Sequence, residues 1–243
     1  MSRIILTMLV MVCVALSASN NLLGADLIAL WTFDQDSGDE VKDVVGGHDG
    51  EIIDGDADWV AGKFGNGLKI QGGGHHVEVE KADDLELPQV TIIAWVNLDT
   101  TADRQEIASY ADSYGLFAEG GVFKVFIFNG GAWNTAPGVT PVAQGEWYQV
   151  AGVVDESEIM LYLNGKLDVK LAIPAIAYQN FPMWFGGGPA DNQFWLTGII
   201  DEIEIWNDVL SEDEIGELYR TPPSLGAVDQ ADKITNTWGN IKK

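Results

Sequence analysis

The feature that most constrains the fold is a series of short apolar runs, alternating or rich in β-branched residues, which continues from Asp26 through most of the chain and is interrupted by Gly, Asn and Asp. Such runs with turn-forming residues between them are typical of antiparallel β-strands. So many short strands favour an all-β fold, built as a two-sheet antiparallel sandwich. The pattern predicts strands at Leu27–Phe33, Gly67–Ile70, His76–Val79, Val90–Val96, Glu106–Tyr110, Leu116–Glu119, Val122–Phe128, Trp147–Val154, Ile159–Leu163, Lys166–Leu171, Met183–Phe185 and Gly198–Trp206.

Two local motifs add detail to this prediction. Asn164-Gly165 separates two of the predicted strands, and both residue types accept the positive φ that a type I′ hairpin turn requires. The sequence Ser211-Glu212-Asp213-Glu214 has the form of a capping box, and apolar residues follow it at helical spacing. We therefore expect a tight hairpin at 164–165 and one short helix near the end of the domain, stopped by Pro222-Pro223.

The two ends of the chain differ from this middle part. Residues 1–25 combine Arg3, the apolar run Ile4–Leu16 and a small or polar stretch, which is the layout of a cleavable signal peptide. The run is shorter than the roughly 20 residues that a membrane-spanning helix needs, so we expect no membrane insertion. The tail 223–243 is mostly polar and is expected to be an appendage. The domain should therefore span 26–222 of a secreted protein, extracellular or periplasmic.

The charge balance excludes two classes of partner. The chain has 13 Lys and Arg against 37 Asp and Glu, which gives a formal net charge of −24. Proteins that bind nucleic acids or membrane surfaces carry basic patches that attract phosphate groups. We therefore expect neither a nucleic-acid partner nor an anionic membrane surface, whereas divalent cations suit so acidic a chain.

Seven stretches, read in order, resemble the laminin-G-like domains of the concanavalin A-like lectin/glucanase superfamily, in the form found in secreted bacterial proteins. They are Ala29–Asp34, Trp59–Leu68, Val90–Val96, Glu146–Ala151, Leu161–Gly165, Gly198–Asn207 and Leu210–Ile215. The resemblance covers most of 26–222 and implies a jelly roll of two antiparallel sheets, in agreement with the strand pattern. It does not decide the function, since this superfamily includes lectins, hydrolases and protein-binding modules on one scaffold.

A glycoside hydrolase would need two carboxylates about 5–10 Å apart. The best candidates are Glu202 and Glu204, which would share one face of a strand. The resemblance implies three acids on one face for a glucanase, whereas the face with Asp201 continues here with Ile203 and Ile205. We therefore expect solvated acids on the outer face of a terminal strand, and a non-catalytic protein.

A calcium site is implied by the resemblance. In related jelly rolls a structural calcium joins the start of the domain to its last strand, which implies Asp34 and Asp201 as ligands with the carbonyl of Gly47 nearby. Calcium takes six to eight oxygen ligands from carboxylates, carbonyls and water. The alternative is that Asp34 caps a turn and Asp201 binds backbone amides.

Aromatic residues outside the expected core indicate a binding site. Flat aromatic rings pack against sugar rings, and amides hydrogen-bond hydroxyl groups. The loops 129–134 and 191–195 each combine aromatic and polar side chains and would meet at one rim; the alternative is that these aromatics only cover the ends of the sandwich. Five of the nine Trp residues fall in the family-like stretches and are expected in the core: Trp31, Trp59, Trp95, Trp147 and Trp206. The candidate ligand contacts are Tyr110, Tyr114, Trp133, Asn134, Trp184, Asn192 and Trp195.

Together these features favour a secreted, non-catalytic, lectin-like domain that binds an extracellular glycan or polysaccharide and holds a structural calcium. A protein-interaction or surface-assembly domain stays open as a second hypothesis, because the same loops could contact another protein. The third hypothesis is a glycoside hydrolase that uses Glu202 and Glu204.

Overall fold

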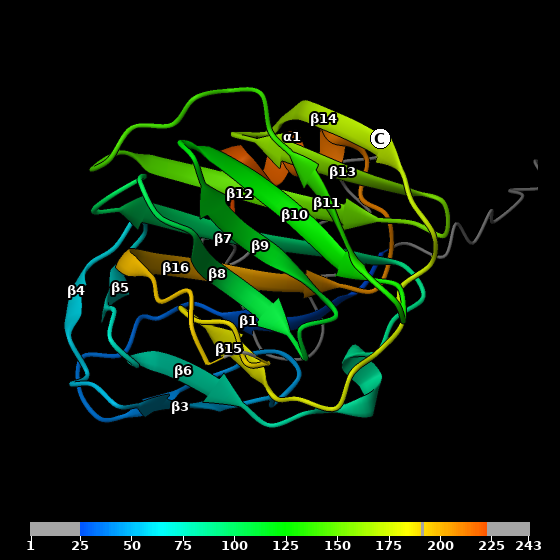
Figure 1. Cartoon of the computed structure of the whole chain (residues 1–243). Helices are drawn as coiled ribbons and strands as arrows, with labels where there is room; N and C mark the ends of the chain where they lie inside the picture. The colour runs from blue at the N-terminus through cyan, green and yellow to red at the C-terminus, as the bar shows by residue number, and fades with distance from the viewer. Residues whose placement is uncertain (1–24, 191, 223–243) are drawn as a thin grey trace, which may run out of the picture.

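The computed structural model describes residues 25–190 and 192–222. The predicted signal peptide, apart from Ala25, and the polar tail (223–243) lie outside the described residues. The described part forms two antiparallel sheets that pack face to face (Figure 1). This confirms the predicted all-β, two-sheet sandwich.

The first sheet has the strand order β14-β13-β12-β7-β16-β5-β4, and β1 also pairs with β16. The long strand β16 therefore lies in the middle of this sheet. The strands are β1 (Leu27–Trp31), β4 (Trp59–Ala61), β5 (Asn66–Gln71), β7 (Val90–Leu98), β12 (Trp147–Val154), β13 (Glu158–Leu163), β14 (Lys166–Ala172) and β16 (Thr197–Trp206).

The second sheet has the order β11-β10-β9-β8-β15-β6-β3-β2. A short 3-10 helix, η1 (Asp83–Leu85), and one α-helix, α1 (Glu212–Arg220), complete the described elements. The strands are β2 (Glu40–Val41), β3 (Gly50–Ile53), β6 (His76–Val79), β8 (Gln105–Tyr110), β9 (Tyr114–Glu119), β10 (Val122–Phe128), β11 (Trp133–Pro137) and β15 (Met183–Phe185).

The main core lies between the two sheets, and a second apolar cluster lies beneath α1. Strand β7 serves both, because Ile92 and Ala94 point into the main core while Ile93 points to the cluster that contains Ile215 and Leu218 of α1. This alternation follows from the two-residue period of a strand. The first sheet is thus buried on both faces where α1 covers it.

The two local motifs are confirmed. Asn164 and Gly165 have φ of 51° and 79° in the turn between β13 and β14. The side chain of Ser211 accepts a hydrogen bond from the backbone N–H of Glu214, and the Glu214 side chain accepts one from the backbone N–H of Ser211, which is a capping box. None of the helices in the described ranges is long and apolar enough to cross a membrane.

The core prediction for the Trp residues is confirmed in part. Trp31, Trp95 and Trp206 are fully buried, whereas Trp59 and Trp147 are only half-buried. Both of the latter lie at strand ends, Trp59 at the start of β4 and Trp147 at the start of β12. Half-burial is common for Trp, because its large ring can keep one edge at the surface.

Candidate functional site

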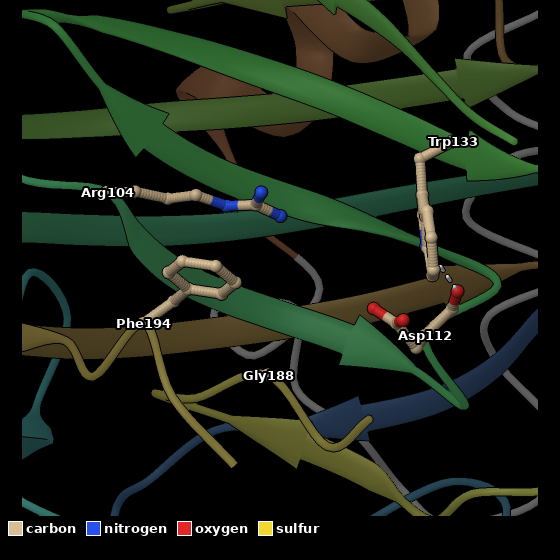
Figure 2. A pocket seen from close by; sticks show the side chains of 5 residues that line it. All are labelled: Arg104, Asp112, Trp133, Gly188 and Phe194. Carbon is tan, nitrogen blue, oxygen red and sulfur yellow. Dashed lines mark hydrogen bonds between the residues drawn. The ribbon is translucent and has the colours of Figure 1, made fainter. Parts of the chain in front are cut away.

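A pocket of about 110 Å³ lies on the side of the second sheet that faces away from the first (Figure 2). Arg104 lies just before β8, Asp112 in the turn between β8 and β9, and Trp133 at the start of β11. Gly188 and Phe194 come from the segment between β15 and β16. The pocket therefore brings a cation, an acid and two aromatic rings together from three separate parts of the chain.

The segment between β15 and β16 folds back on itself beside the pocket. The backbone N–H of Gly188 donates to the carbonyl of Gln193 at 2.9 Å, and that of Asn192 donates to the carbonyl of Gly188 at 3.0 Å. The backbone N–H of Glu106 donates to the carbonyl of Phe194 at 2.8 Å and ties the segment to β8. Phe194 has a φ of 63°, which is uncommon for a residue with a side chain. The position of its ring thus depends on these backbone hydrogen bonds.

The guanidinium group of Arg104 is fixed by its neighbours. Its central carbon lies 4.0 Å from the ring centre of Phe194 and 4.5 Å from that of Phe117. Its Nε and Nη2 donate to Oε1 of Glu106 at 3.1 and 2.5 Å. Cation–π contacts and charge-assisted hydrogen bonds both stabilise this placement. Arg104 therefore offers the pocket a charged donor in a defined position.

Glu106 is a buried carboxyl group behind the pocket, with 1% of its surface exposed. Burial raises its pKa to about 7, although the neighbouring Arg104 lowers it. Its Oε2 atom has no hydrogen-bond partner among the residues that the structure describes. Gly188 lies over this group, because a Cβ atom built there would come within 3.4 Å of Cγ of Glu106. The ionisation state of Glu106 therefore changes close to neutral pH, and with it the strength of the two hydrogen bonds from Arg104.

Trp133 is the exposed aromatic wall of the pocket, with 51% of its surface accessible. Its Nε1 donates to the carbonyl of Asp112 at 3.2 Å, and its ring centre lies 5.1 Å from that of Phe128. The side-chain amide of Gln179 donates to the same carbonyl at 2.8 Å. An anchored ring with one free face beside polar groups is the combination found in sites for amphipathic ligands such as sugars.

The two loops predicted to form one rim do meet in this pocket, through Trp133 and Phe194. Asn134 is half-buried beside Trp133, and its amide donates to the carbonyl of Ala132 at 3.3 Å. Asn192 is exposed on the folded-back segment. Neither Asn lines the pocket itself, and Trp133 and Asn134 begin a strand, β11, where the sequence predicted only a loop.

Trp184 and Trp195 pack on the same sheet, beside the pocket rather than in its lining. Their ring centres lie 5.9 Å apart in a stacked arrangement, and His76 lies 3.9 Å from Trp184. Trp184 is buried and donates to Oε2 of Glu78 at 2.8 Å. These two rings cover the outer face of β15 and β6, whereas the alternative expected the aromatics to cover the ends of the sandwich.

Tyr110 and Tyr114 were predicted outside the core, and this prediction is wrong. Both are fully buried in the main core, where their rings stack at 5.2 Å. They are cross-strand partners on β8 and β9, and side chains of directly opposed residues lie on the same face of a sheet, so both rings point inward. Their hydroxyl groups donate to the backbone carbonyls of Ala82 and Leu85, at 2.6 and 3.3 Å, which makes burial of a phenol possible.

The acids of β16 were predicted to be solvated, and this too is wrong. Asp201, Glu202 and Glu204 are all fully buried. A β-bulge at Glu202, which has a φ of 47°, breaks the alternation, so Ile200 and Ile203 both point into the main core. Asp201 and Glu204 therefore face the same side, toward α1, because Asp201 pairs with Trp95 and Glu204 with Ile93. Glu202 and Glu204 are closed off from solvent, and a polysaccharide does not reach them in this structure.

The carboxyl group of Glu204 shows how strongly burial shifts the pKa of these acids. Nε1 of Trp206 donates to its Oε2 at 2.7 Å. Burial nevertheless raises the pKa of Glu204 to about 8, and this hydrogen bond only partly opposes the effect.

The sequence profile of the concanavalin A-like lectin/glucanases superfamily, in its laminin-G form, matches residues 71–216. This range covers more than half of the chain and includes every residue of the pocket. The chain belongs to this superfamily. A comparison with curated proteins finds no match.

Solved structures of the same superfamily fold are similar at low sequence identity. The fourth domain of an extracellular arabinanase from Geobacillus stearothermophilus, in complex with arabinotriose, has a TM-score of 0.64 at 19% identity, over 80% of this chain and 98% of that chain. The binding domain of a paraclostridial mosquitocidal protein gives 0.64 at 15%, over 80% and 52%, and that of botulinum neurotoxin serotype D gives 0.63 at 15%, over 81% and 52%. The chain thus spans about half the length of these toxin domains. At such identities the likeness establishes the fold alone.

The calcium ligands implied by the superfamily are brought together only in part. Asp34 and Asp201 both contact the turn 62–66: Asp34 accepts from the backbone N–H of Asn66 at 3.0 Å, and Oδ2 of Asp201 accepts from those of Lys63 and Phe64 at 2.8 and 2.9 Å. Gly47 lies instead in the loop 43–48, where the neighbouring glycine packs against the start of β1. The predicted set is therefore not assembled as a whole.

The two acids by themselves suit an oxygen-binding cation. Oδ1 of Asp201 is buried without a hydrogen-bond partner in the described part of the chain. Burial and, to a lesser extent, the charge of nearby Asp34 raise the pKa of Asp201 to about 7, although the backbone N–H donors of Phe64 and Lys63 lower it. A cation would relieve both effects. The described residues contain no group of three or more His, Cys, Asp or Glu side chains that could hold a metal, so further ligands would have to come from backbone carbonyls or water.

Sequence reasoning missed Arg104, Asp112 and Gly188, and it singled out the loop 191–195 without naming Phe194 as a ligand contact. Arg104 and Phe194 are 90 positions apart in the sequence and come together only because the segment after β15 folds back on β8. A weak indication was present, since Arg104 is one of only 13 basic residues in the chain.

Proposed function

We propose that this protein is a non-catalytic carbohydrate-binding domain whose ligand site is the pocket of Arg104, Asp112, Trp133, Gly188 and Phe194. The observation that carries the proposal is the exposed ring of Trp133 beside a fixed guanidinium and a carboxylate. A sugar offers C–H groups to such a ring and hydroxyls to such polar groups.

One comparison and one prediction from the sequence support this function. The arabinanase domain with the same fold was solved with arabinotriose, a saccharide. The predicted signal peptide would bring the domain outside the cytoplasm, where it would meet extracellular polysaccharides. A protein ligand is the competing occupant of the same surface, because the same loops could contact another protein.

The glycoside hydrolase hypothesis is less well supported. Its two candidate carboxylates, Glu202 and Glu204, are fully buried on the first sheet, away from the pocket. A hydrolase needs both groups in contact with the scissile bond and with water.

We also propose that Asp34 and Asp201 hold a structural calcium at the turn 62–66. The buried Oδ1 of Asp201 supports this, since it lacks a protein partner in the described ranges. The cation would bind these carboxylates and stabilise the join between the segment after β1 and strand β16.

The proposed function is tested with a panel of soluble polysaccharides and titration calorimetry. We expect at least one ligand to bind, and Trp133→Ala to weaken it roughly tenfold, which corresponds to about 1.4 kcal/mol. Trp147→Ala is the matched control, because Trp147 is half-buried on the opposite sheet and should not affect binding. If no saccharide binds while a protein partner does, the protein-interaction function replaces this one.

A further inference from the structure

The charges around the pocket limit which sugar it can accept. Arg104 and Asp112 line it, and Glu106 binds Arg104 from behind. On the next two strands Glu119 and Lys124 form an ion pair at 2.6 Å. Three carboxylates thus surround two cations, in a chain whose net charge is −24. Even with Glu106 protonated the local charges only balance, so an anionic ligand gains little here and is repelled at longer range.

The hydrogen-bonding groups also favour a neutral ligand. The edge of the guanidinium formed by Nε and Nη2 already binds Glu106. Paired binding of a ligand carboxylate to this edge would require displacement of a buried group. The end of the guanidinium and the Asp112 carboxylate point into the same space, with the rings of Phe194 and Trp133 beside it (Figure 2).

A hydroxyl group suits this arrangement better than a carboxylate. It accepts from an N–H of Arg104 and donates to a carboxylate oxygen of Asp112, which a deprotonated acid group cannot do. Asp112 would instead repel a uronate or sulfate placed in the same position.

We propose that the pocket binds an uncharged saccharide unit, with Asp112 as acceptor and Arg104 as donor for its hydroxyl groups, and that Asp112 excludes uronate and sulfated sugars. This inference rests on the proposed carbohydrate-binding function and adds the class of its ligand.

The test compares neutral and acidic polysaccharides on matched backbones by titration calorimetry. Fully methyl-esterified polygalacturonan is paired with polygalacturonate, and hydroxyethyl cellulose with carboxymethyl cellulose. Arabinan, galactan, xylan and mannan extend the neutral set, and alginate, hyaluronan and chondroitin sulfate extend the acidic set. The tightest ligand is expected to be neutral, with a Kd at least tenfold below that of any acidic polysaccharide.

The variant Asp112→Asn removes the charge and keeps the shape. Asp112 has a φ of 53°, which Asn tolerates well, so the turn should form normally. Binding of the neutral ligand should weaken roughly tenfold while acidic polysaccharides gain affinity. Asp103→Asn removes the same charge from an exposed position just before Arg104 and should change neither. Equal melting temperatures of the two variants would show that the fold is kept.

The outcomes separate the two levels of the proposal. If the tightest ligand is acidic, or if Asp112→Asn behaves as Asp103→Asn does, the ligand class is wrong while carbohydrate binding stands. If neither neutral nor acidic polysaccharides bind, the proposed function fails and this inference fails with it.

Discussion

At the scale of single residues, the pocket depends on a carboxyl group that is not part of its lining. Glu106 fixes Arg104 through two hydrogen bonds from the protein interior. Burial raises its pKa to about 7; Arg104 lowers it, and the charges of Asp112 and Glu119 raise it. Glu106 is therefore a positioning residue whose charge changes close to neutral pH.

Ligand affinity should consequently increase several-fold as the pH rises from about 6 to about 8, because ionised Glu106 holds Arg104 more firmly. Glu106→Gln should flatten this profile. Titration calorimetry across this pH range checks the prediction, with Asp103→Asn, at an exposed position just before Arg104, as a control that keeps the profile. An equally steep profile in Glu106→Gln would assign the pH dependence to another group.

Glu204 gives a second prediction, on stability. Its pKa rises from the ordinary 4.5 to about 8 on folding, so the folded state keeps a proton that the unfolded state releases. The free energy of unfolding should therefore fall as the pH rises from about 4.5 to about 8, by on the order of a few kcal/mol from this group. Glu204→Gln should remove that part of the slope, as measured by urea unfolding at several pH values. Identical slopes in both proteins would show that Glu204 is ionised in the folded state.

The sequence predicted single residues unevenly, and the reasons are physical. Trp133 stands among glycines and amides, a local context that indicates an exposed aromatic. Tyr110 and Tyr114 lie outside the family-like stretches and were therefore predicted outside the core, yet strand alternation and two distant backbone carbonyls place them in the core. The contact of Arg104 with Phe194 depends on tertiary packing, which local sequence patterns do not predict.

At the scale of elements, most of the strands were predictable. The twelve predicted strands are all present, including the short β6 and β15, because their residues either alternate with the period of a strand or are all apolar. β2, β3, β4 and β11 were not predicted; each has two to five residues, and its pairing partner defines it more than its own residues do. The bulge of β16 was hidden because it uses Glu202 at positive φ rather than a glycine.

The hairpin between β13 and β14 gives a third prediction. Gly165 has a φ of 79°, and a Cβ atom there would lie 3.0 Å from Cα of Gly216 and 3.1 Å from Cβ of Tyr219 in α1. Gly145 has a φ of 77° with open space around it. Both Gly→Ala variants should lose about 1 kcal/mol or more through backbone strain, and Gly165→Ala should lose more because it also pushes against α1. Chemical denaturation measures the free energy of unfolding of both variants. Equal losses would mean that α1 shifts to accommodate the added methyl group without loss of stability.

At the scale of the whole molecule, the sequence predicted the sandwich and the superfamily because both rest on features spread along the chain. The site was predicted only as two loops that would meet, since its lining depends on how the segment after β15 is tied to β8. The same limit applies to the calcium ligands, of which the two acids are close together and Gly47 is in another loop.

The proposed calcium gives a prediction for the stability of the whole domain. Calcium should raise the melting temperature by several degrees relative to chelator, because a ligand that binds only the folded state stabilises it. Asp34 is exposed, so Asp34→Asn should abolish this shift while the melting temperature in chelator hardly changes. Asp36→Asn, at a neighbouring exposed position, should keep the shift. A calcium shift that survives in Asp34→Asn would rule out this site.

The most direct test of carbohydrate binding at the pocket is a crystal structure of the protein with the oligosaccharide that binds best in the panel. A sugar ring stacked on Trp133, with hydroxyl groups hydrogen-bonded to Arg104 and Asp112, is the predicted result. A sugar bound on the first sheet, or on the second sheet without contact to Trp133, would contradict it.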